Sequence, residues 1–276
     1  MRYALIENKR GSHIKQEVLL LVFSKEAIML IDTHAHMISE YYPDLDKLLK
    51  KLMNVVIINS ASNRADNYEI DVMCDKYTNV FGTTGIHPNE CGEWNEECKK
   101  MIETLIKKEK FVAVGEVGLD YYYDISREKQ KEIFIEQLEM AKKHNKPVVI
   151  HSRAAAEDTY QILKRYPELK KVLHCYDYDV EYAHKFIELN CRLGINGIVT
   201  FKNNQQKKIV EEIDLKHLLA ETDSPFLTPV PDRGKRNDSL KIKYIIEEIA
   251  KIKNLSFDEV NERLIKNAIE QFDLSF

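Results

Sequence analysis

The chain has 276 residues and a formal net charge of −4, with 44% hydrophobic and 31% charged residues. This composition is typical of a soluble globular protein, and the length suits one large α/β domain or two smaller ones. The charge balance excludes a general attraction to nucleic acid or anionic membranes, although a basic patch or a bound cation could still attract nucleic acid. The five cysteines form no C-x-x-C pair, which favours reduced thiols in a cytoplasmic protein over a disulfide framework.

The first 28 residues do not fit the pattern of the rest. Their apolar run at residues 18–23 is too short to span a bilayer, and Lys25 and Glu26 follow it closely. No small-residue cleavage site follows either, so a signal peptide is the less favoured interpretation. We expect residues 1–28 to be an N-terminal extension, disordered or upstream of a natural start at Met29. Residues 29–276 should form a single domain.

From residue 27 onward, short apolar runs alternate with longer amphipathic stretches. Near-continuous apolar runs are typical of strands in a parallel sheet that is covered on both faces. Eight strands are predicted, at residues 27–31, 55–58, 80–86, 111–115, 147–150, 171–174, 191–195 and 217–220.

Helical patterns fill the intervals between these runs. In the stretch 128–144, Ile133, Phe134, Leu138 and Ala141 recur at spacings of three and four residues. Similar patterns cover residues 154–166, 180–190, 203–213, 239–253 and 256–272, the last opened by a capping box of Ser256 and Glu259. Eight strand–helix units predict a (β/α)₈ TIM barrel with parallel strands and outer helices. A doubly wound open sheet is the alternative.

Ionisable side chains gather where the predicted strands end. In a (β/α)₈ barrel, these ends meet at the C-terminal rim, where active sites lie. His34 and His36 follow the first strand and share a face, because side chains at i and i+2 point the same way. The fourth, fifth, sixth and eighth strands end in Glu116, His151, His174 and Asp223.

Each of these six residues has an ordinary interpretation when it is taken alone. A strand-end histidine is usually satisfied by a local hydrogen bond, and an acid there is often a helix cap. Six of them on one rim are hard to attribute to accident, and imidazoles with carboxylates suit zinc, manganese or similar divalent ions. Six ligands are too many for one tetrahedral ion, so the pattern predicts a binuclear hydrolase. His87, on the same rim, is expected to contact substrate rather than to be a seventh ligand.

The chain from Leu30 onward resembles the TatD family of metal-dependent deoxyribonucleases, within the amidohydrolase superfamily. The matching motifs occur in the family's order across nearly the whole chain. They are IDTHAH (31–36), GIHP (85–88), GEVGLDY (115–121), HSR (151–153), HCY (174–176), GIVTFK (197–202) and ETDSPFL (221–227).

The resemblance implies two divalent ions per chain, Mg, Mn or Zn, with the ligands divided between them. His34, His36 and Asp223 would hold one ion, His151 and His174 the other, and Glu116 would bridge the two. Related hydrolases often bridge with a carboxylated lysine, so Glu116 points away from phosphotriesterase-like and dihydroorotase-like members. One departure is the loop after strand 8, where residues 234–239 read GKRNDS and lack the family's proline. Substrate contacts from that loop are therefore less secure.

The implied activity is hydrolysis of DNA phosphodiester bonds by a metal-activated water, as a 3′–5′ exonuclease on single strands or strand ends. Asp223 is the candidate general base, and Glu116 is the second catalytic candidate. The candidate substrate contacts are His87, Asp120, Arg153, Lys202 and Arg236. Residues 121–123, three tyrosines, could stack on bases.

Two other functions remain open at the level of sequence. The same site could hydrolyse an ester or amide, as in a D-aminoacyl-tRNA deacylase, because the ligand set does not separate carbonyl from phosphoryl attack. A non-catalytic barrel is the second of these hypotheses, and it is disfavoured because all six predicted ligands are present. We expect a cytoplasmic protein without membrane association. The oligomeric state is left open, a monomer included.

Overall fold

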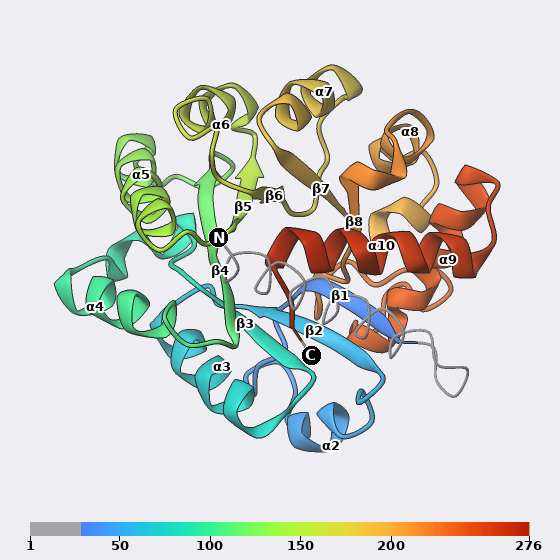
Figure 1. The fold of residues 1–276 in the computed structure, drawn as a ribbon, viewed down its shortest axis with the longest axis horizontal. Helices are drawn as coiled ribbons and strands as arrows, with labels where there is room; N and C mark the ends of the chain where they lie inside the picture. The colour runs from blue at the N-terminus through green and yellow to red at the C-terminus, as the bar shows by residue number, and fades with distance from the viewer. Residues whose placement is uncertain (1–28, 276) are drawn as a thin grey trace, which may run out of the picture.

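The computed structural model describes residues 29–275. The expectation for residues 1–28 lies outside these described residues. Within them, eight parallel strands form one sheet in which each strand pairs with the next along the chain (Figure 1). The strands are β1 (Leu30–Ala35), β2 (Val55–Ser60), β3 (Val80–Thr84), β4 (Phe111–Asp120), β5 (Val148–Arg153), β6 (Lys171–Leu173), β7 (Cys191–Ile195) and β8 (Leu218–Ala220).

The last strand returns to lie beside the first. The Asp223 amide donates to the His34 carbonyl at 2.9 Å, and the His36 amide donates to the Ser224 carbonyl at 2.6 Å. The Thr33 hydroxyl also donates to the Ala220 carbonyl at 3.0 Å. These bonds join β1 to the chain that follows β8, so the (β/α)₈ barrel predicted from the sequence is confirmed and the open sheet is not.

Helices surround the strands, and those from α5 onward occupy the stretches in which the periodic patterns predicted them. They are α2 (Leu45–Leu49), α3 (Arg64–Lys76), α4 (Glu96–Leu105), α5 (Arg127–Lys143), α6 (Ala156–Leu163), α7 (Val180–Glu188), α8 (Gln205–Glu212), α9 (Ile242–Lys253) and α10 (Phe257–Phe272). The capping box of Ser256 and Glu259 is present at the start of α10. The helix expected at residues 239–253 begins as a short 3₁₀ turn, η4 (Ser239–Lys241), before α9.

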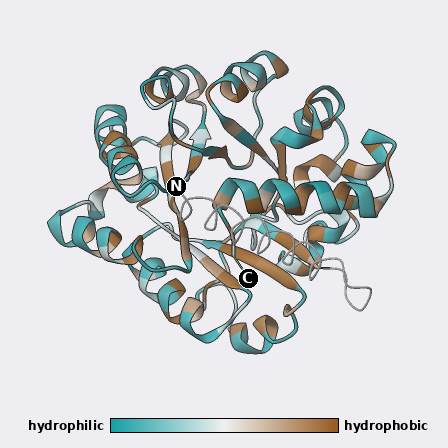
Figure 2. Cartoon of the chain, in the orientation of Figure 1, coloured by the Kyte–Doolittle hydropathy of each residue, from teal (hydrophilic) through white to brown (hydrophobic). Residues whose placement is uncertain are grey.

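Helix α10 closes the N-terminal end of the barrel. In Figure 1 it crosses the ring of strands, and Figure 2 shows the apolar strands inside a shell of helices with hydrophilic outer faces. Ile265, Ala268 and Phe272 of α10 share one buried apolar cluster with strand residues such as Ile31 and Val149. Full burial of a large apolar side chain such as Ile265 or Phe272 contributes about 1.5–3 kcal/mol. This end is therefore dry and apolar, which leaves the opposite rim for ionisable groups.

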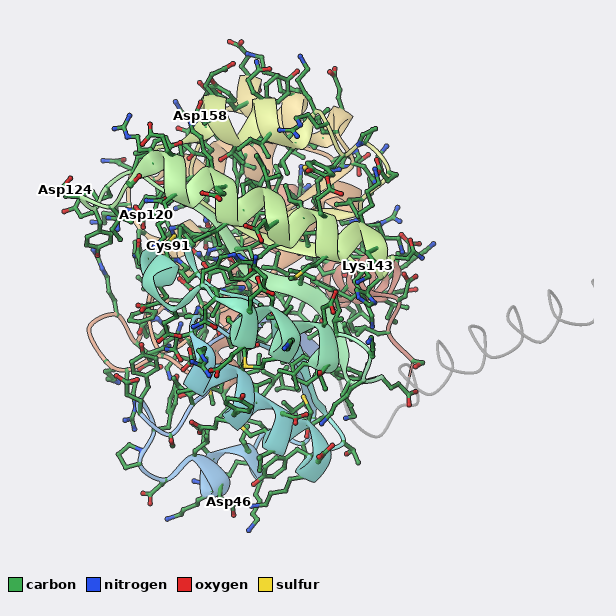
Figure 3. All side chains as sticks on the ribbon, turned by 90° about the vertical axis from the view of Figure 1, so that its left-hand side faces the viewer. Asp46, Cys91, Asp120, Asp124, Lys143 and Asp158 are labelled. Carbon is green, nitrogen blue, oxygen red and sulfur yellow. The ribbon has the colours of Figure 1, made fainter. Side chains whose placement is uncertain are left out.

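The opposite rim is formed by strand ends and helix starts. Figure 3 shows Asp120 and Asp124 near one edge of the molecule, whereas Lys143, at the end of α5, lies towards the other. β4 is longer than predicted and continues to Asp120, with a shift in its pairing to β5 between Val114 and Val117. Glu116, expected just beyond the strand, therefore lies within it.

Candidate metal centre

The carboxylate of Glu116 lies between two pairs of imidazoles. Its Oε2 atom is 3.4 Å from Nε2 of His34 and 3.3 Å from Nε2 of His36. Its Oε1 atom is 2.9 Å from Nδ1 of His151 and 2.7 Å from Nε2 of His174. One buried side chain thus presents a separate oxygen to each pair.

Asp223 completes the first of these two groups. Its Oδ1 atom lies 3.6 Å from His34 Nε2 and 3.5 Å from His36 Nε2, and these two nitrogens are 3.1 Å apart. Asp223 has a left-handed backbone with φ of 54°, which is uncommon outside glycine and recurs at functional sites. The three side chains can each offer one ligand atom to a single ion.

Ser60, at the end of β2, orients both histidines of this group. Its carbonyl lies 2.9 Å from His36 Nδ1 and its hydroxyl lies 3.0 Å from His34 Nδ1. A carbonyl oxygen only accepts, so His36 Nδ1 carries the hydrogen and a neutral His36 presents its Nε2 lone pair to the site. Such an outer contact is the usual way to fix a metal-binding imidazole. Ser60 was not among the predicted site residues. Its place at the end of a predicted strand is the signal that could have identified it.

The second group contains His151 and His174, whose Nδ1 and Nε2 atoms are 3.1 Å apart. Nε2 of His151 lies 3.1 Å from Oδ2 of Asp120. Because the ionised carboxylate accepts, Nε2 carries the hydrogen and Nδ1 of a neutral His151 faces Glu116 with its lone pair. Asp120 is 1% exposed, so its side chain contacts His151 rather than the open mouth of the barrel.

His87 approaches the second group with a different tautomer. Its Nε2 atom lies 3.4 Å from Glu116 Oε1, and His87, Glu116 and His151 are placed so that they could hold one ion together. However, the Asn89 amide donates to His87 Nδ1 at 3.1 Å. The neutral ring therefore carries its hydrogen on Nε2, which makes it a hydrogen-bond donor towards the site. The substrate contact expected of His87 stays a prediction.

The two acids of the cluster, Glu116 and Asp223, both have lowered pKa values. Burial alone would raise the pKa of Glu116, but the neighbouring imidazoles of His174, His87 and His151 hold it well below its usual range. Asp223 shows the same balance, with burial outweighed by His36, His174 and His34, so its pKa is also lowered. Both acids are therefore ionised at neutral pH.

Three of the histidines, His34, His36 and His151, differ in the direction of their pKa shifts. Burial and the nearby His174 lower the pKa of His34 to about 4, so this ring is neutral. Burial also opposes charge on His36 and His151, but adjacent carboxylates prevail and raise the pKa of His36 and bring that of His151 to about 9. Ionised carboxylates packed among oriented imidazoles form a donor set that fits divalent cations, which would take the place of these protons.

Glu221 lies behind His174 and is fully buried. Its Oε1 atom accepts from the Cys175 amide at 2.6 Å and lies 3.8 Å from His174 Nδ1. Among the described residues, neither His174 Nδ1 nor Glu221 Oε2 has a hydrogen-bond partner. Gly194 leaves room for this carboxylate, because a Cβ atom there would overlap it.

The other predicted substrate contacts are exposed cations at the end of β5 and on loops beyond the strands. The guanidinium of Arg153 lies 3.9 Å from the ring centroid of Tyr122. Arg236 donates from Nη1 to the Tyr41 carbonyl at 2.7 Å. Lys202 is exposed in the loop that precedes α8. Unlike the six central residues, these three are not gathered into one cluster by any contact among the described residues.

No helix within residues 29–275 combines the length and apolar character needed to cross a bilayer.

Comparison with known proteins gives one consistent result. Residues 31–273 match the family model described as TatD related DNase. The chain is 37% identical over 257 residues to the uncharacterized metal-dependent hydrolase YabD of Bacillus subtilis strain 168, covering 90% of this chain and 100% of that protein. It is 32% identical over 259 residues to the uncharacterized metal-dependent hydrolase YcfH of Escherichia coli K12, covering 90% and 97%.

The fold has close counterparts among solved structures. YjjV, a TatD homologue from Escherichia coli K12, superposes with a TM-score of 0.83 at 24% identity, covering 89% of this chain and 98% of that one. A TatD family hydrolase from Entamoeba histolytica gives a TM-score of 0.79 at 22% identity, covering 89% and 98%. On this match over most of its length, the chain belongs to the TatD-related family of metal-dependent hydrolases.

Proposed function

We propose that this protein is a deoxyribonuclease that hydrolyses phosphodiester bonds at the ends of single-stranded DNA, as a 3′–5′ exonuclease. The observation that carries the proposal is the division of the Glu116 oxygens between two imidazole pairs. Two cations joined by one carboxylate are a recurrent arrangement for phosphoryl transfer, because they stabilise both the attacking and the leaving oxygen. The description of the matching family as a DNase supports DNA as the substrate.

We assign two divalent ions, Mg, Mn or Zn, to this cluster. His34, His36 and Asp223 would hold one, His151 and His174 would hold the other, and Glu116 would contact both. Such ions, when bound, polarise a phosphoryl oxygen and lower the pKa of a water molecule from 15.7 to roughly 7. All six ligands come from one chain, so the site is complete within a single subunit and a monomer would suffice.

Asp223 is the proposed general base. Its carboxylate is ionised because its pKa is lowered, and its side chain is 12% exposed, compared with 3% for Glu116. It can therefore accept a proton from a water that enters through the mouth of the barrel. His87, with its hydrogen on Nε2, would donate to a phosphate oxygen. The ionisation and exposure of Asp223 support the first role, and the hydrogen position that the Asn89 amide imposes on His87 supports the second.

The exposed cations Arg153, Lys202 and Arg236 are the proposed contacts to backbone phosphates. Contacts of this kind position a nucleic acid without reading its sequence. The five cysteines are all free thiols, in keeping with a reducing, cytoplasmic setting for this activity.

The test is degradation of single-stranded DNA labelled at either the 3′ or the 5′ end, in EDTA or with Mg²⁺, Mn²⁺ or Zn²⁺. We expect metal-dependent shortening from the 3′ end that is lost in His34→Ala and Asp223→Ala. His184→Ala, an exposed histidine on α7, is the matched control and should retain activity.

Two results would contradict the proposal. Intact DNA under every metal condition removes the nuclease assignment, and release of the amino acid from D-aminoacyl-tRNA in the same preparation would replace it with the deacylase. Cleavage that persists in both ligand variants would mean that a contaminating enzyme is responsible.

A further inference from the structure

Phe226 exposes an aromatic ring beside the first ligand group. The residue is 49% exposed, and its ring centroid lies 6.3 Å from that of His36 at an interplanar angle of 63°. Single exposed apolar side chains are common on protein surfaces and need no explanation by themselves. The surroundings of this one are more informative, because they fix its position and place a cation against Tyr41, the tyrosine whose ring contacts it.

The backbone of Phe226 is held on both sides. Its amide donates to the Asp223 carbonyl at 2.9 Å, and its carbonyl accepts from Asn237 Nδ2 at 2.7 Å. The next residue, Leu227, has a left-handed backbone with φ of 51°. The segment that carries the ring is therefore tied to the metal ligand Asp223, and little ordering would be needed when a ligand arrives.

Tyr41 supports the ring from the loop after β1. The centroids of Tyr41 and Phe226 are 5.6 Å apart with an interplanar angle of 71°, so the rings are perpendicular rather than stacked. By contrast, the exposed Tyr122 already has the Arg153 guanidinium over its face at 3.9 Å. Within the contacts described for residues 29–275, Phe226 is thus an exposed ring near the cluster with neither a stacked ring nor a cation over its face.

Positive charge adjoins the same tyrosine. Arg236 is exposed, donates to the Tyr41 carbonyl at 2.7 Å and lies over the ring of Tyr42 at 4.9 Å. It lines a hollow of about 230 Å³ together with two further cations, Lys47 and Lys51, and two acids, Asp44 and Asp238. Asp238 is ion-paired with Lys241, so the cations of the hollow are not balanced by its acids.

We propose that Phe226 is the platform for one unpaired nucleobase next to the scissile phosphate, with an adjoining backbone phosphate held by Arg236. A flat aromatic surface beside a guanidinium matches the chemistry of a nucleotide, because every base has a π-face and every linkage has an anionic oxygen. A base inside a duplex has both faces covered by its neighbours. The platform therefore selects single strands or frayed ends. This inference rests on the proposed nuclease function and specifies the part of the substrate that the site grips.

The first test measures binding without cleavage. A fluorescein-labelled single-stranded 12-mer is titrated in EDTA with wild type, Phe226→Ala, Phe226→Leu and Phe226→Trp, and affinity is read by anisotropy. We expect Phe226→Ala and Phe226→Leu to weaken binding about 5- to 100-fold, as for loss of one stacked base. Phe226→Trp should restore it. Tyr68→Ala, an exposed aromatic residue on α3, is the matched control and should bind as wild type.

The second test locates the base on the DNA. Each of the three terminal nucleotides at either end is replaced in turn by an abasic residue. At one position, removing the base should weaken binding to wild type but not to Phe226→Ala, because the interaction is already lost. Binding to the blunt duplex 12-mer should not depend on Phe226.

The outcomes separate this inference from the proposed function. If wild type cleaves DNA and Phe226→Ala binds and cleaves equally well, the platform is wrong and the nuclease assignment stands. Equal losses at every abasic position, or a leucine variant that binds as well as wild type, would also overturn the stacking role. A wild-type protein that neither binds nor cleaves DNA would overturn both.

Discussion

Oδ2 of Asp120 lies 3.1 Å from Nε2 of His151, and this contact turns the opposite nitrogen of the ring, Nδ1, towards Glu116. Burial raises the pKa of Asp120, but the bond to His151 and the Tyr122 amide outweigh it and lower the pKa. The acid is therefore ionised and accepts the hydrogen of His151. Asp120 was expected to contact substrate, but its buried carboxylate lies behind His151, a proposed metal ligand.

Replacing Asp120 should weaken metal binding by the protein. Without the carboxylate, the ring of His151 is free to rotate and to exchange tautomers. We expect Asp120→Ala to lower metal affinity about 10- to 100-fold, the usual cost of removing such a partner. Isothermal titration with Mn²⁺ measures this. Asp124→Ala, in the adjacent loop, is the control. Unchanged affinity in Asp120→Ala would show that the contact does not orient the ligand.

His87 should act on the substrate and not on the metal. Because the Asn89 amide occupies Nδ1, the ring offers a hydrogen rather than a lone pair to the site. We expect His87→Ala to keep the wild-type metal content while DNA cleavage falls about 10- to 100-fold, as for loss of one hydrogen bond to a charged group. Metal analysis of the purified variant decides the matter, since a fall in bound metal would make His87 a ligand.

Gly194 should be intolerant of even one added methyl group. A Cβ atom at this position would overlap the carboxylate of Glu221 and displace it from the Cys175 amide. Overpacking of this kind costs about 1–3 kcal/mol of the free energy of unfolding, which urea denaturation of the metal-free protein would reveal. Gly92→Ala is the matched control, because a Cβ there meets nothing within 4 Å. Equal stability of the two variants would argue against a fixed Glu221.

Metal binding should strengthen as pH rises towards 9. The pKa of His151 is raised from 6.5 to about 9 in the metal-free protein, so protons compete with the ion below that value. The same shift stabilises the metal-free fold fully below pH 6.5, and this stabilisation is lost as pH rises through about 9. The increase in unfolding temperature on adding Mn²⁺ should therefore grow between pH 6.5 and 9. A flat or falling increase would contradict this.

The barrel could be predicted because parallel strands covered on both faces must be apolar along their length. The predicted apolar runs, such as residues 55–58 and 147–150, therefore stand out from the amphipathic helices between them. Once the strands are assigned to a parallel barrel, their C-terminal ends must all lie on one rim. That is why His34, Glu116 and Asp223, nearly two hundred residues apart, could be assigned to one site before any distance was known.

The details that escaped prediction depend on register and on loop packing. The extension of β4 to Asp120 is set by its pairing with β5, where Leu119 lies opposite Ser152. The contact from Asp120 to His151 follows from that long-range register, which local sequence does not encode. The exposure of Phe226 likewise depends on the turn after β8, in which Asp223 and Leu227 adopt left-handed conformations. Neither residue type predicts such a conformation from the sequence.

The number of metal ions bound per chain tests the proposed binuclear site most directly, because Glu116 would contact two ions at once. Wild type, His36→Ala and Glu116→Gln would be dialysed against Mn²⁺ and their metal content measured, with circular dichroism as a check on folding. We expect two ions per chain in wild type and one in His36→Ala. Glu116→Gln should lose affinity at both positions. One ion in wild type, or two retained at wild-type affinity in Glu116→Gln, would contradict the bridged pair.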